Sequence, residues 1–332
     1  MPPSGASASP PERHWYRLSW LSCLLAPLSL GFAAAVVLRR MAYRARWLRA
    51  ERLPVPVVVV GNLVAGGTGK TPLVLWLVDA LRARGFQPGI VSRGYRGASR
   101  AACEVLPGSD PARFGDEPIL LAERGDVPVW IGRDRAAAGR GLLAAHPECN
   151  LVICDDGLQH YALARDFEIA VEDERGHGNG LLLPAGPLRE PPSRPVDAVV
   201  LNGAPERAGT FAMRLQPTGF HRVADPGRSV SVESLRARRL HAVAGIGNPR
   251  RFFATLDALG LVFTPHVFPD HHAFAARDLD FTDCDAVLMT EKDAVKCRAF
   301  ARDDLLALRV EARVDEHLAH LITTRVRGPQ AA

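Results

Sequence analysis

The sequence predicts an α/β fold in which helices cover a mostly parallel sheet. Short apolar runs, of which residues 57–60 are the most regular, alternate along the chain with longer segments of helical character. Hydrophobic residues make up 47% and charged residues 23% of the 332 residues, which is the composition of a globular protein. A chain of this length can bury two cores of ordinary size, so we expect two domains.

The N-terminal region starts with a Pro-, Ser- and Ala-rich tail that we expect to be disordered. No charged residue then occurs from residue 18 to residue 38, a length that can span a bilayer as a helix. Pro27 and Gly31 would weaken such a helix, so a helix lying in the membrane interface is also possible. Six arginines and one acid follow between residues 39 and 52. By the positive-inside rule this cluster places the next domain on the cytoplasmic side.

The run at residues 57–60 leads into Gly66-Gly67-Thr68-Gly69-Lys70-Thr71 and then into a helix expected from about Pro72. A strand, a glycine-rich loop and a helix N-terminus together bind phosphate through backbone N–H groups and the helix dipole. Lys70 is placed to contact the β- and γ-phosphates, and the Thr71 hydroxyl to ligate Mg²⁺. Such a loop also argues against a cleaved signal peptide near residues 31–35, because export would separate it from ATP.

Further strands and helices alternate after this loop. The segment 178–192 is too rich in Pro and Gly for regular structure, and long connections of this kind often carry function. A second, smaller α/β unit is expected from about Leu240, with Asn248 and Pro249 as N-cap and first residue of a helix. We expect helices over residues 72–84 and 134–145, and strands over residues 89–92, 127–131, 151–154, 167–171, 197–201, 241–246 and 285–290.

Three polar clusters could carry chemistry. Asp155 and Asp156 end an apolar strand, where an acid beside a phosphate-binding loop often holds Mg²⁺. Asp116 stands at the start of a predicted helix, and its spacing alone favours helix capping over catalysis. His271 stands in Pro269-Asp270-His271-His272, where a metal site and a proton-transfer pair are both open. The six cysteines form no Cys-x-x-Cys pair, which argues against a zinc ribbon or disulfide framework and indicates a reducing compartment.

Taken together, these motifs resemble the tetraacyldisaccharide 4′-kinase family, the membrane-bound enzymes of lipid A synthesis in Gram-negative bacteria. The resemblance extends from about residue 15 to about residue 320. It rests on motifs at residues 61–72, 92–95, 115–118, 155–160, 184–190, 244–253, 268–272 and 290–296, which occur in this order.

The resemblance implies phosphoryl transfer from ATP to the 4′-hydroxyl of a tetraacyl glucosamine disaccharide 1-phosphate, with ATP and Mg²⁺ as cofactors. It implies a P-loop NTPase-like α/β/α domain and a smaller α/β domain with ATP between them, preceded by a membrane-associated helix. The expected partners are the lipid A precursor disaccharide and inner-membrane lipids, not nucleic acid, with the catalytic domains on the cytoplasmic side of the bacterial inner membrane. The expected divisions are a tail at 1–14, an anchor at 15–50, a kinase domain at 51–238 and a C-terminal domain at 239–325.

Residue roles follow from the same resemblance. The nucleotide loop comprises Val64, Ala65, Gly66, Gly67, Thr68, Gly69, Lys70 and Thr71. Asp116 matches the catalytic base and His271 the histidine that assists it, which overrides the capping interpretation, and Lys70 acts on the transferred phosphate. Thr71, Asp155 and Asp156 match the metal-binding positions. Glu117, His160 and Arg189 match other positions that contact the substrate or support the site.

Two other functions remain open from the sequence. One is a GTPase or metallochaperone-type NTPase that shares the Gly-Gly-x-Gly-Lys-Thr loop. Guanine selection usually requires Asn-Lys-x-Asp, and the nearest string, at residues 290–293, has its lysine one place late. The other is a membrane-tethered ATP-binding module without catalysis, which predicts no lipid-dependent production of ADP.

Overall fold

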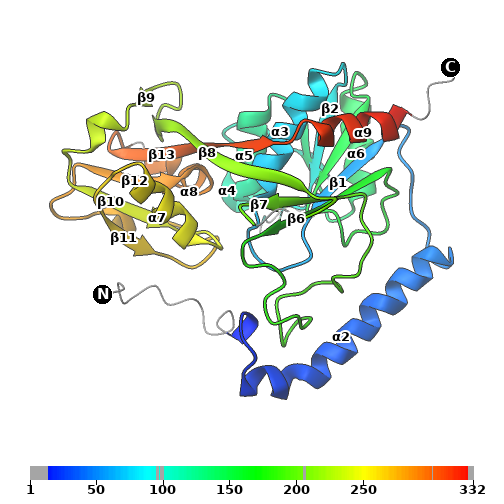
Figure 1. Cartoon of the computed structure of the whole chain (residues 1–332). Coiled ribbons are helices and arrows are strands. Elements are labelled where there is room, and N and C mark those ends of the chain that lie inside the picture. The colour runs from blue at the N-terminus through cyan, green and yellow to red at the C-terminus, as the bar shows by residue number, and fades with distance from the viewer. Residues whose placement is uncertain (1–13, 95–96, 98–100, 205–206, 301, 328–332) are drawn as a thin grey trace.

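The computed structural model describes residues 14–94, 97, 101–204, 207–300 and 302–327. Most of the predicted N-terminal tail lies outside the described residues. So do Tyr95, the last residue of the motif at residues 92–95, and Arg96, which follows it. The described part forms two lobes joined by one continuous sheet (Figure 1). We call the lobe with the phosphate-binding loop the large lobe and the lobe with strands β10 to β12 the small lobe.

The sheet contains thirteen strands among the described residues, and most neighbouring pairs are parallel. Its order is β11-β10-β12-β13-β8-β7-β6-β1-β5-β2-β4-β3, with β9 beside β8. The antiparallel pairs are β13 with β8, β8 with β9, and β3 with β4. The predicted α/β class with a mostly parallel sheet is therefore confirmed.

The large lobe is a three-layer α/β/α arrangement built around β1 (Val57–Gly61). Because side chains alternate along a strand, Val58 and Val60 pack with α3 on one face, while Val57 and Val59 pack with α6 on the other. Its other elements are β2 (Pro88–Ser92), β3 (Cys103–Glu104), α4 (Pro111–Phe114), α5 (Asp116–Gly125), β4 (Val129–Ile131), α6 (Arg135–Ala145), β5 (Leu151–Asp155), β6 (Phe167–Asp173), β7 (Ala198–Asn202) and α3 (Lys70–Arg82).

The small lobe has its own two cores, one on each face of β10 and β12. As predicted, Asn248 caps α7, its side chain accepting from the Arg251 N–H, and Pro249 is the first helical residue. Its elements are β9 (Ser229–Val230), η1 (Glu233–Leu235), β10 (Leu240–Ala244), α7 (Pro249–Ala258), β11 (Phe263–Val267), η2 (Ala276–Leu279), β12 (Ala286–Thr290), α8 (Glu291–Cys297) and η3 (Arg298–Phe300).

Two long strands connect the lobes. β8 (Phe211–Arg222) and β13 (Leu305–Val314) pair in antiparallel fashion over most of their lengths, with a register shift between Arg309 and Val310. The sequence analysis did not predict either strand. The chain then returns to the large lobe, where α9 (His317–Arg327) packs against α3. The exact domain boundaries remain a prediction.

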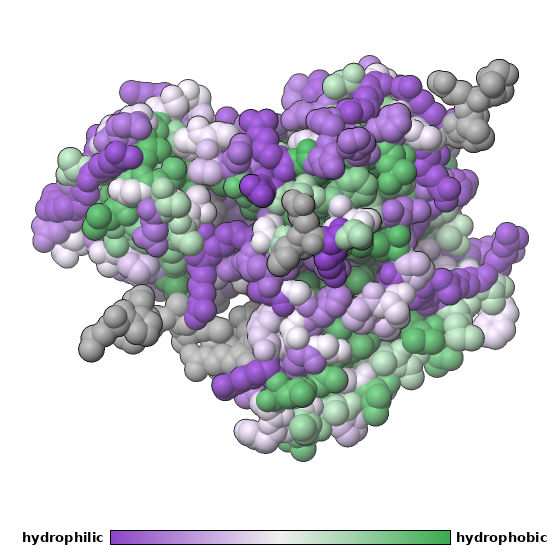
Figure 2. Space-filling view, viewed as in Figure 1, coloured by the Kyte–Doolittle hydropathy of each residue, from purple (hydrophilic) through white to green (hydrophobic). Residues whose placement is uncertain are grey.

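The N-terminal apolar run forms α2 (Trp20–Arg44), which lies along one side of the large lobe (Figure 1). Only 11% of its most apolar stretch of 18 residues is buried. Figure 2 shows hydrophobic residues along the outer side of the helix. Two serines hold it to the irregular segment 178–192. Ser29 Oγ donates to Leu182 O at 2.7 Å and accepts from the Ala185 N–H at 3.0 Å, while Asn179 Nδ2 lies 3.4 Å from Ser22 Oγ.

Candidate active site

The phosphate-binding loop follows β1, and α3 begins at Lys70. Three side chains hold the loop backbone: Asn62 Nδ2 donates to Gly66 O at 2.9 Å, Asn202 Nδ2 to Thr68 O at 2.9 Å, and Arg175 Nη2 to Gly67 O at 2.6 Å. Gly69 has φ +94°, and a Cβ there would overlap the Asn202 amide nitrogen. The turn therefore requires glycine at this position.

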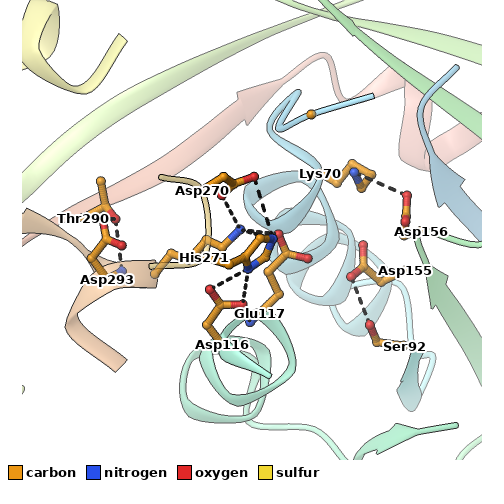
Figure 3. A network of polar contacts seen from close by, with 12 residues as sticks. Lys70, Ser92, Asp116, Glu117, Asp155, Asp156, Asp270, His271, Thr290 and Asp293 are labelled. Carbon is orange, nitrogen blue, oxygen red and sulfur yellow. Dashed lines mark hydrogen bonds and ion pairs between the residues drawn. The ribbon is translucent and has the colours of Figure 1, made fainter. Parts of the chain in front are cut away.

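Lys70 and the two acids at the end of β5 converge at the carboxyl end of the sheet (Figure 3). Lys70 Nζ lies 3.4 Å from Asp156 Oδ1 and donates to Asn62 Oδ1 at 3.3 Å. Arg189 Nη1 lies 3.1 Å from the same Asp156 oxygen. Asp155 is 1% exposed and accepts from Ser92 Oγ at 3.4 Å. Adjacent strand ends of a parallel sheet thus bring one cation and two acids together, as the sequence predicted.

Burial and neighbouring charges shift the pKa values of Asp155 and Asp156 in opposite directions. Burial and the nearby Glu117 carboxylate raise the pKa of Asp155 to about 7. Burial also acts to raise the pKa of Asp156, but the Lys70 ammonium and the Arg189 guanidinium outweigh it and hold that pKa well below its usual range. Asp156 also has φ +48°, an uncommon backbone conformation that is concentrated at functional sites.

A second group faces the first from the start of α5 and from the small lobe. His271 Nδ1 lies 3.0 Å from Asp116 Oδ2 and 3.1 Å from Asp116 Oδ1. His271 has φ +60°, and its backbone N–H donates to Gly245 O at 3.1 Å. Asp116 also accepts from the Glu117 N–H at 3.0 Å, so it helps to satisfy the first turn of α5 as well as pairing with His271.

The charge of Asp116 is fixed by this environment. Burial acts to raise its pKa, but the hydrogen bond to His271 and the positive charge of Lys292 outweigh burial and lower the pKa to about 2. For Glu117, burial is likewise outweighed by Lys292 and Lys70, and its pKa is lowered. Both carboxylates are therefore ionised at neutral pH, and an ionised carboxylate can accept a proton.

A cavity of 520 Å³ lies between the lobes, and one residue of each group lines it: Lys70 of the first group and Glu117 of the second. Residues 67–72 and Glu117 line it from the large lobe, and residues 246–248 and 290–292 line it from the small lobe. The lobes touch beside it, since a Cβ on Gly247 would lie 3.1 Å from the Gly67 backbone nitrogen. Ion pairs also join the two lobes. Arg124 Nη1 lies 2.7 Å from Glu291 Oε2, and Lys292 Nζ lies 2.9 Å from Glu117 Oε1.

Not every predicted site residue reaches the cavity wall. Six of them line it: Gly67, Thr68, Gly69, Lys70, Thr71 and Glu117. The lining does not include Asp116, His271, Asp155, Asp156 or Arg189. Val64 instead packs its side chain into the core, and its backbone bridges to Leu188. His160 lies outside the group described above: its Nε2 accepts from the Arg135 N–H at 3.3 Å. Burial and the charges of Arg135 and Arg165 lower the pKa of His160 to about 4. Nucleotide binding at Val64 and substrate binding at His160 remain predictions.

Sequence reasoning gave no role to several residues of the site. Asn62, Arg175 and Asn202 support the phosphate-binding loop. Asn62 stands in the motif at residues 61–72 but was given no role, and no local motif identifies Arg175 or Asn202. Lys292 could have been found, because residues 291–293 follow the buried strand β12, as Asp156 follows β5. Polar residues at that position in a parallel sheet often belong to a site.

Several known proteins are similar to this chain over most of its length. The profile of the family described as Tetraacyldisaccharide-1-P 4′-kinase matches residues 21–327. The chain is 52% identical over 318 residues to the tetraacyldisaccharide 4′-kinase of Methylobacillus flagellatus, with 95% of each chain covered. It is 51% identical to the protein of the same name from Dechloromonas aromatica, covering 97% of this chain and 98% of that protein. A crystal structure of LpxK from Aquifex aeolicus in complex with ATP matches with a TM-score of 0.79 and 31% identity, over 92% of this chain and 99% of that chain.

Proposed function

The chain belongs to the tetraacyldisaccharide 4′-kinase family, and on this basis we propose the reaction that it catalyses. It is an ATP-dependent kinase that phosphorylates the 4′-hydroxyl of a tetraacyl glucosamine disaccharide 1-phosphate in lipid A biosynthesis. The observation that carries this proposal is the pairing of Asp116 with His271 next to the cavity that the phosphate-binding loop lines: Lys70 lines this cavity, and so does Glu117, which directly follows Asp116. A switch GTPase or a passive ATP-binding module gives no reason for this pairing.

We assign the proton acceptor to Asp116. A sugar hydroxyl is a weak nucleophile and must lose its proton as its oxygen attacks the γ-phosphorus of ATP. Asp116 is 5% exposed and ionised, and His271 holds its carboxylate from the small lobe. Lys70 and the backbone N–H groups at the start of α3 stabilise the negative charge of the transferred phosphoryl group. Arg189, bound to Asp156, orders the metal-binding side of the site.

The residues beside Lys70 fit a magnesium ion. Asp155 Oδ1 is buried and has no hydrogen-bond partner within the described part of the chain, and burial of an unpaired carboxylate oxygen is costly. Two carboxylates and the Thr71 hydroxyl form the oxygen donor set that Mg²⁺ prefers. We propose that Asp155, Asp156 and Thr71 hold the ion. When bound, Mg²⁺ neutralises charge on the β- and γ-phosphates.

We propose that α2 lies in the membrane interface and does not cross the bilayer. Ser29 stands near the middle of α2, yet it hydrogen-bonds to Leu182 and Ala185 in an irregular segment. If the middle of α2 lay at the bilayer centre, that irregular backbone would be carried into hydrocarbon, where its polar groups could not be satisfied. A helix in the interface keeps the catalytic lobes beside the acyl chains of the substrate, on the cytoplasmic face of the inner membrane.

Cysteine labelling in oriented membranes tests the position of α2. Leu18 and Met41 lie near its two ends and are 73% and 57% exposed. In inside-out vesicles, a membrane-impermeant thiol reagent should label Leu18→Cys and Met41→Cys to a similar extent in a background with Cys23 replaced. Labelling of one end only from each side of the membrane would show that α2 spans the bilayer.

A transfer assay tests the kinase function directly. Purified full-length protein in detergent micelles should transfer radiolabelled phosphate from the γ-position of ATP to a tetraacyl disaccharide 1-phosphate, in a Mg²⁺-dependent manner. GTP in place of ATP should give little product. ADP formation that is independent of the lipid, with no labelled lipid, would contradict the proposal and favour an ATPase or a binding module.

A further inference from the structure

Lys292 makes three contacts in the active site that the reaction outlined above does not use. It stands at the start of α8 in the small lobe, and its Nζ lies 2.9 Å from Glu117 Oε1, 3.4 Å from His271 Nε2 and 3.7 Å from Asp270 Oδ1. Its side chain is 18% exposed. A buried ammonium is therefore in contact with the ring nitrogen that faces away from Asp116.

The chemistry of an ammonium group restricts what that ring nitrogen can carry. A lysine ammonium has three donors and no acceptor. His271 Nε2 can interact favourably with it only as an acceptor, so the ring proton must stand on Nδ1, where it is donated to Asp116. We propose that Lys292 is a positioning residue that fixes His271 as the neutral tautomer protonated on Nδ1. Such a histidine donates to the ionised Asp116 without giving it a full positive charge as partner, which leaves Asp116 a better proton acceptor.

Asp270 supplies the opposing influence. Its Oδ2 lies 3.8 Å from the same His271 Nε2, and a carboxylate there favours a protonated nitrogen. The charged groups around the pair are thus Asp116 and Glu117 on α5, Asp270 beside His271, and Lys292 and Lys296 on α8. Of the two lysines, only Lys292 is in contact with the ring: Lys296 Nζ lies 4.0 Å from Asp116 Oδ2 and 2.6 Å from Asp293 Oδ1.

The expected effect of Lys292 on turnover rests on the proposed kinase function. The first test concerns only the tautomer of His271 and does not require activity. Nitrogen NMR of the full-length protein in micelles distinguishes a protonated from an unprotonated ring nitrogen, and loss of signals in His271→Gln assigns the residue. At neutral pH the wild type should show a protonated Nδ1 and an unprotonated Nε2. In Lys292→Met, His271 Nε2 should become protonated. An unprotonated Nδ1 in the wild type would overturn the inference, even if the kinase reaction is confirmed.

Kinetics supplies the second test. In Lys292→Met the acidic limb of the pH–kcat profile should move to higher pH, and kcat measured on that limb should fall about tenfold for each pH unit of the move, while ATP affinity changes little. Adding Asp270→Asn should move the limb back, because the competing carboxylate is gone. Lys292→Arg keeps a donor-only cation and should retain the wild-type tautomer.

Lys296→Met is the matched control, since it removes a lysine near Asp116 that does not contact His271. Its His271 spectrum should resemble that of the wild type. If His271 Nε2 is also protonated in Lys296→Met, the cause is a general loss of positive charge and not the loss of the contact with Lys292. If Lys292→Met weakens ATP binding and leaves the His271 spectrum unchanged, Lys292 acts on the nucleotide and the inference is wrong.

Discussion

His271 and Asp116 are 155 residues apart in the sequence, yet His271 Nδ1 lies 3.0 Å from Asp116 Oδ2. The two residues come from different lobes, so their pairing exists only when the cleft is arranged as described above. In the proposed reaction, Asp116 of this pair is the proton acceptor. The contact between the two residues then makes turnover depend on the relative position of the lobes, because a shift of about 1 Å at a reacting group is costly in rate.

Replacing Asp116 with asparagine should abolish most turnover and leave ATP affinity nearly unchanged. An amide keeps the shape of the carboxylate but cannot accept a proton, and removal of a general base costs about 10²- to 10⁴-fold in kcat. Steady-state kinetics and nucleotide titration of Asp116→Asn would measure the two effects separately. Equal losses in ATP binding and kcat would instead indicate a metal-binding or capping role for Asp116.

The double variant Asp116→Asn/His271→Gln tests whether the pair acts as one unit. If His271 acts only through Asp116, the double variant should be little slower than Asp116→Asn, because the effects of coupled residues do not add. The same assay on both single variants completes the cycle. Additive losses would show that His271 has an independent role, for example in binding the substrate.

Substitutions test the proposed roles of Lys70 and Thr71, with the conservative change Thr71→Ser as a control. Lys70→Met removes the ammonium near the transferred phosphate and should lower kcat about 10²- to 10³-fold. Thr71→Ala removes the proposed metal ligand, whereas Thr71→Ser keeps the hydroxyl and should retain most activity. Titration of Mg²⁺ at saturating ATP checks the assignment. If Thr71→Ala and Thr71→Ser show the same requirement for Mg²⁺, Thr71 does not ligate the metal.

His221 should make the free energy of unfolding fall in mild acid. It is 8% exposed in β8, and burial together with the charges of Arg309 and Arg124 lowers its pKa from 6.5 to about 4. Between these values the unfolded chain binds a proton that the folded chain does not, so stability decreases as pH falls. For this residue the loss between pH 7 and pH 5 is about 2 kcal/mol.

The matched variant for this effect is His221→Gln, which keeps a polar side chain without a titration near neutral pH. Denaturant unfolding of both proteins at pH 7 and pH 5 should show a smaller decrease in the variant. Parallel decreases would mean that His221 titrates alike in the folded and unfolded states.

The large lobe could be predicted because its strands are buried on both faces and read as continuous apolar runs, as β1 and β5 do. The connecting strands could not. Most of β8 is only partly buried, and it contains Pro217 and Gly219, so neither alternation nor composition identifies it as a strand. Its pairing with β13, which lies about 90 residues later, supplies the hydrogen bonds, and such a partner is not visible in a local pattern.

The residues of the candidate site also include some that the local sequence predicts and some that it does not. Asp155 and Asp156 could be predicted from their place after a buried strand. Asp116 could not, since its local signal was that of a capping residue, and the structure shows that it does accept the Glu117 N–H. Its proposed role as proton acceptor rests on contact with His271 from the opposite lobe, and only the family resemblance anticipated that contact. Lys292 was missed although it comes soon after the predicted strand at residues 285–290, because residues 290–293 were compared with a guanine-binding motif.

The last prediction concerns how α2 presents the lipid to the site. Ser29 makes two of the bonds that hold α2 to the segment 178–192, at 2.7 and 3.0 Å. Ser29→Ala removes both and leaves the backbone groups of Leu182 and Ala185 without these partners, at a cost of about 1–3 kcal/mol. The apolar surface of α2 is unchanged, so binding to vesicles should persist, whereas KM for the lipid should rise several-fold with no change in ATP affinity.

Leu30→Ala should behave in the opposite way. Leu30 is 72% exposed on α2, so its truncation leaves the contacts with residues 178–192 intact but removes apolar surface that would enter the bilayer. Vesicle sedimentation should therefore weaken, and KM measured in detergent micelles should stay close to that of the wild type. If Ser29→Ala lowers vesicle binding as much as Leu30→Ala does, the serine serves membrane attachment and not the alignment of the lipid with Asp116.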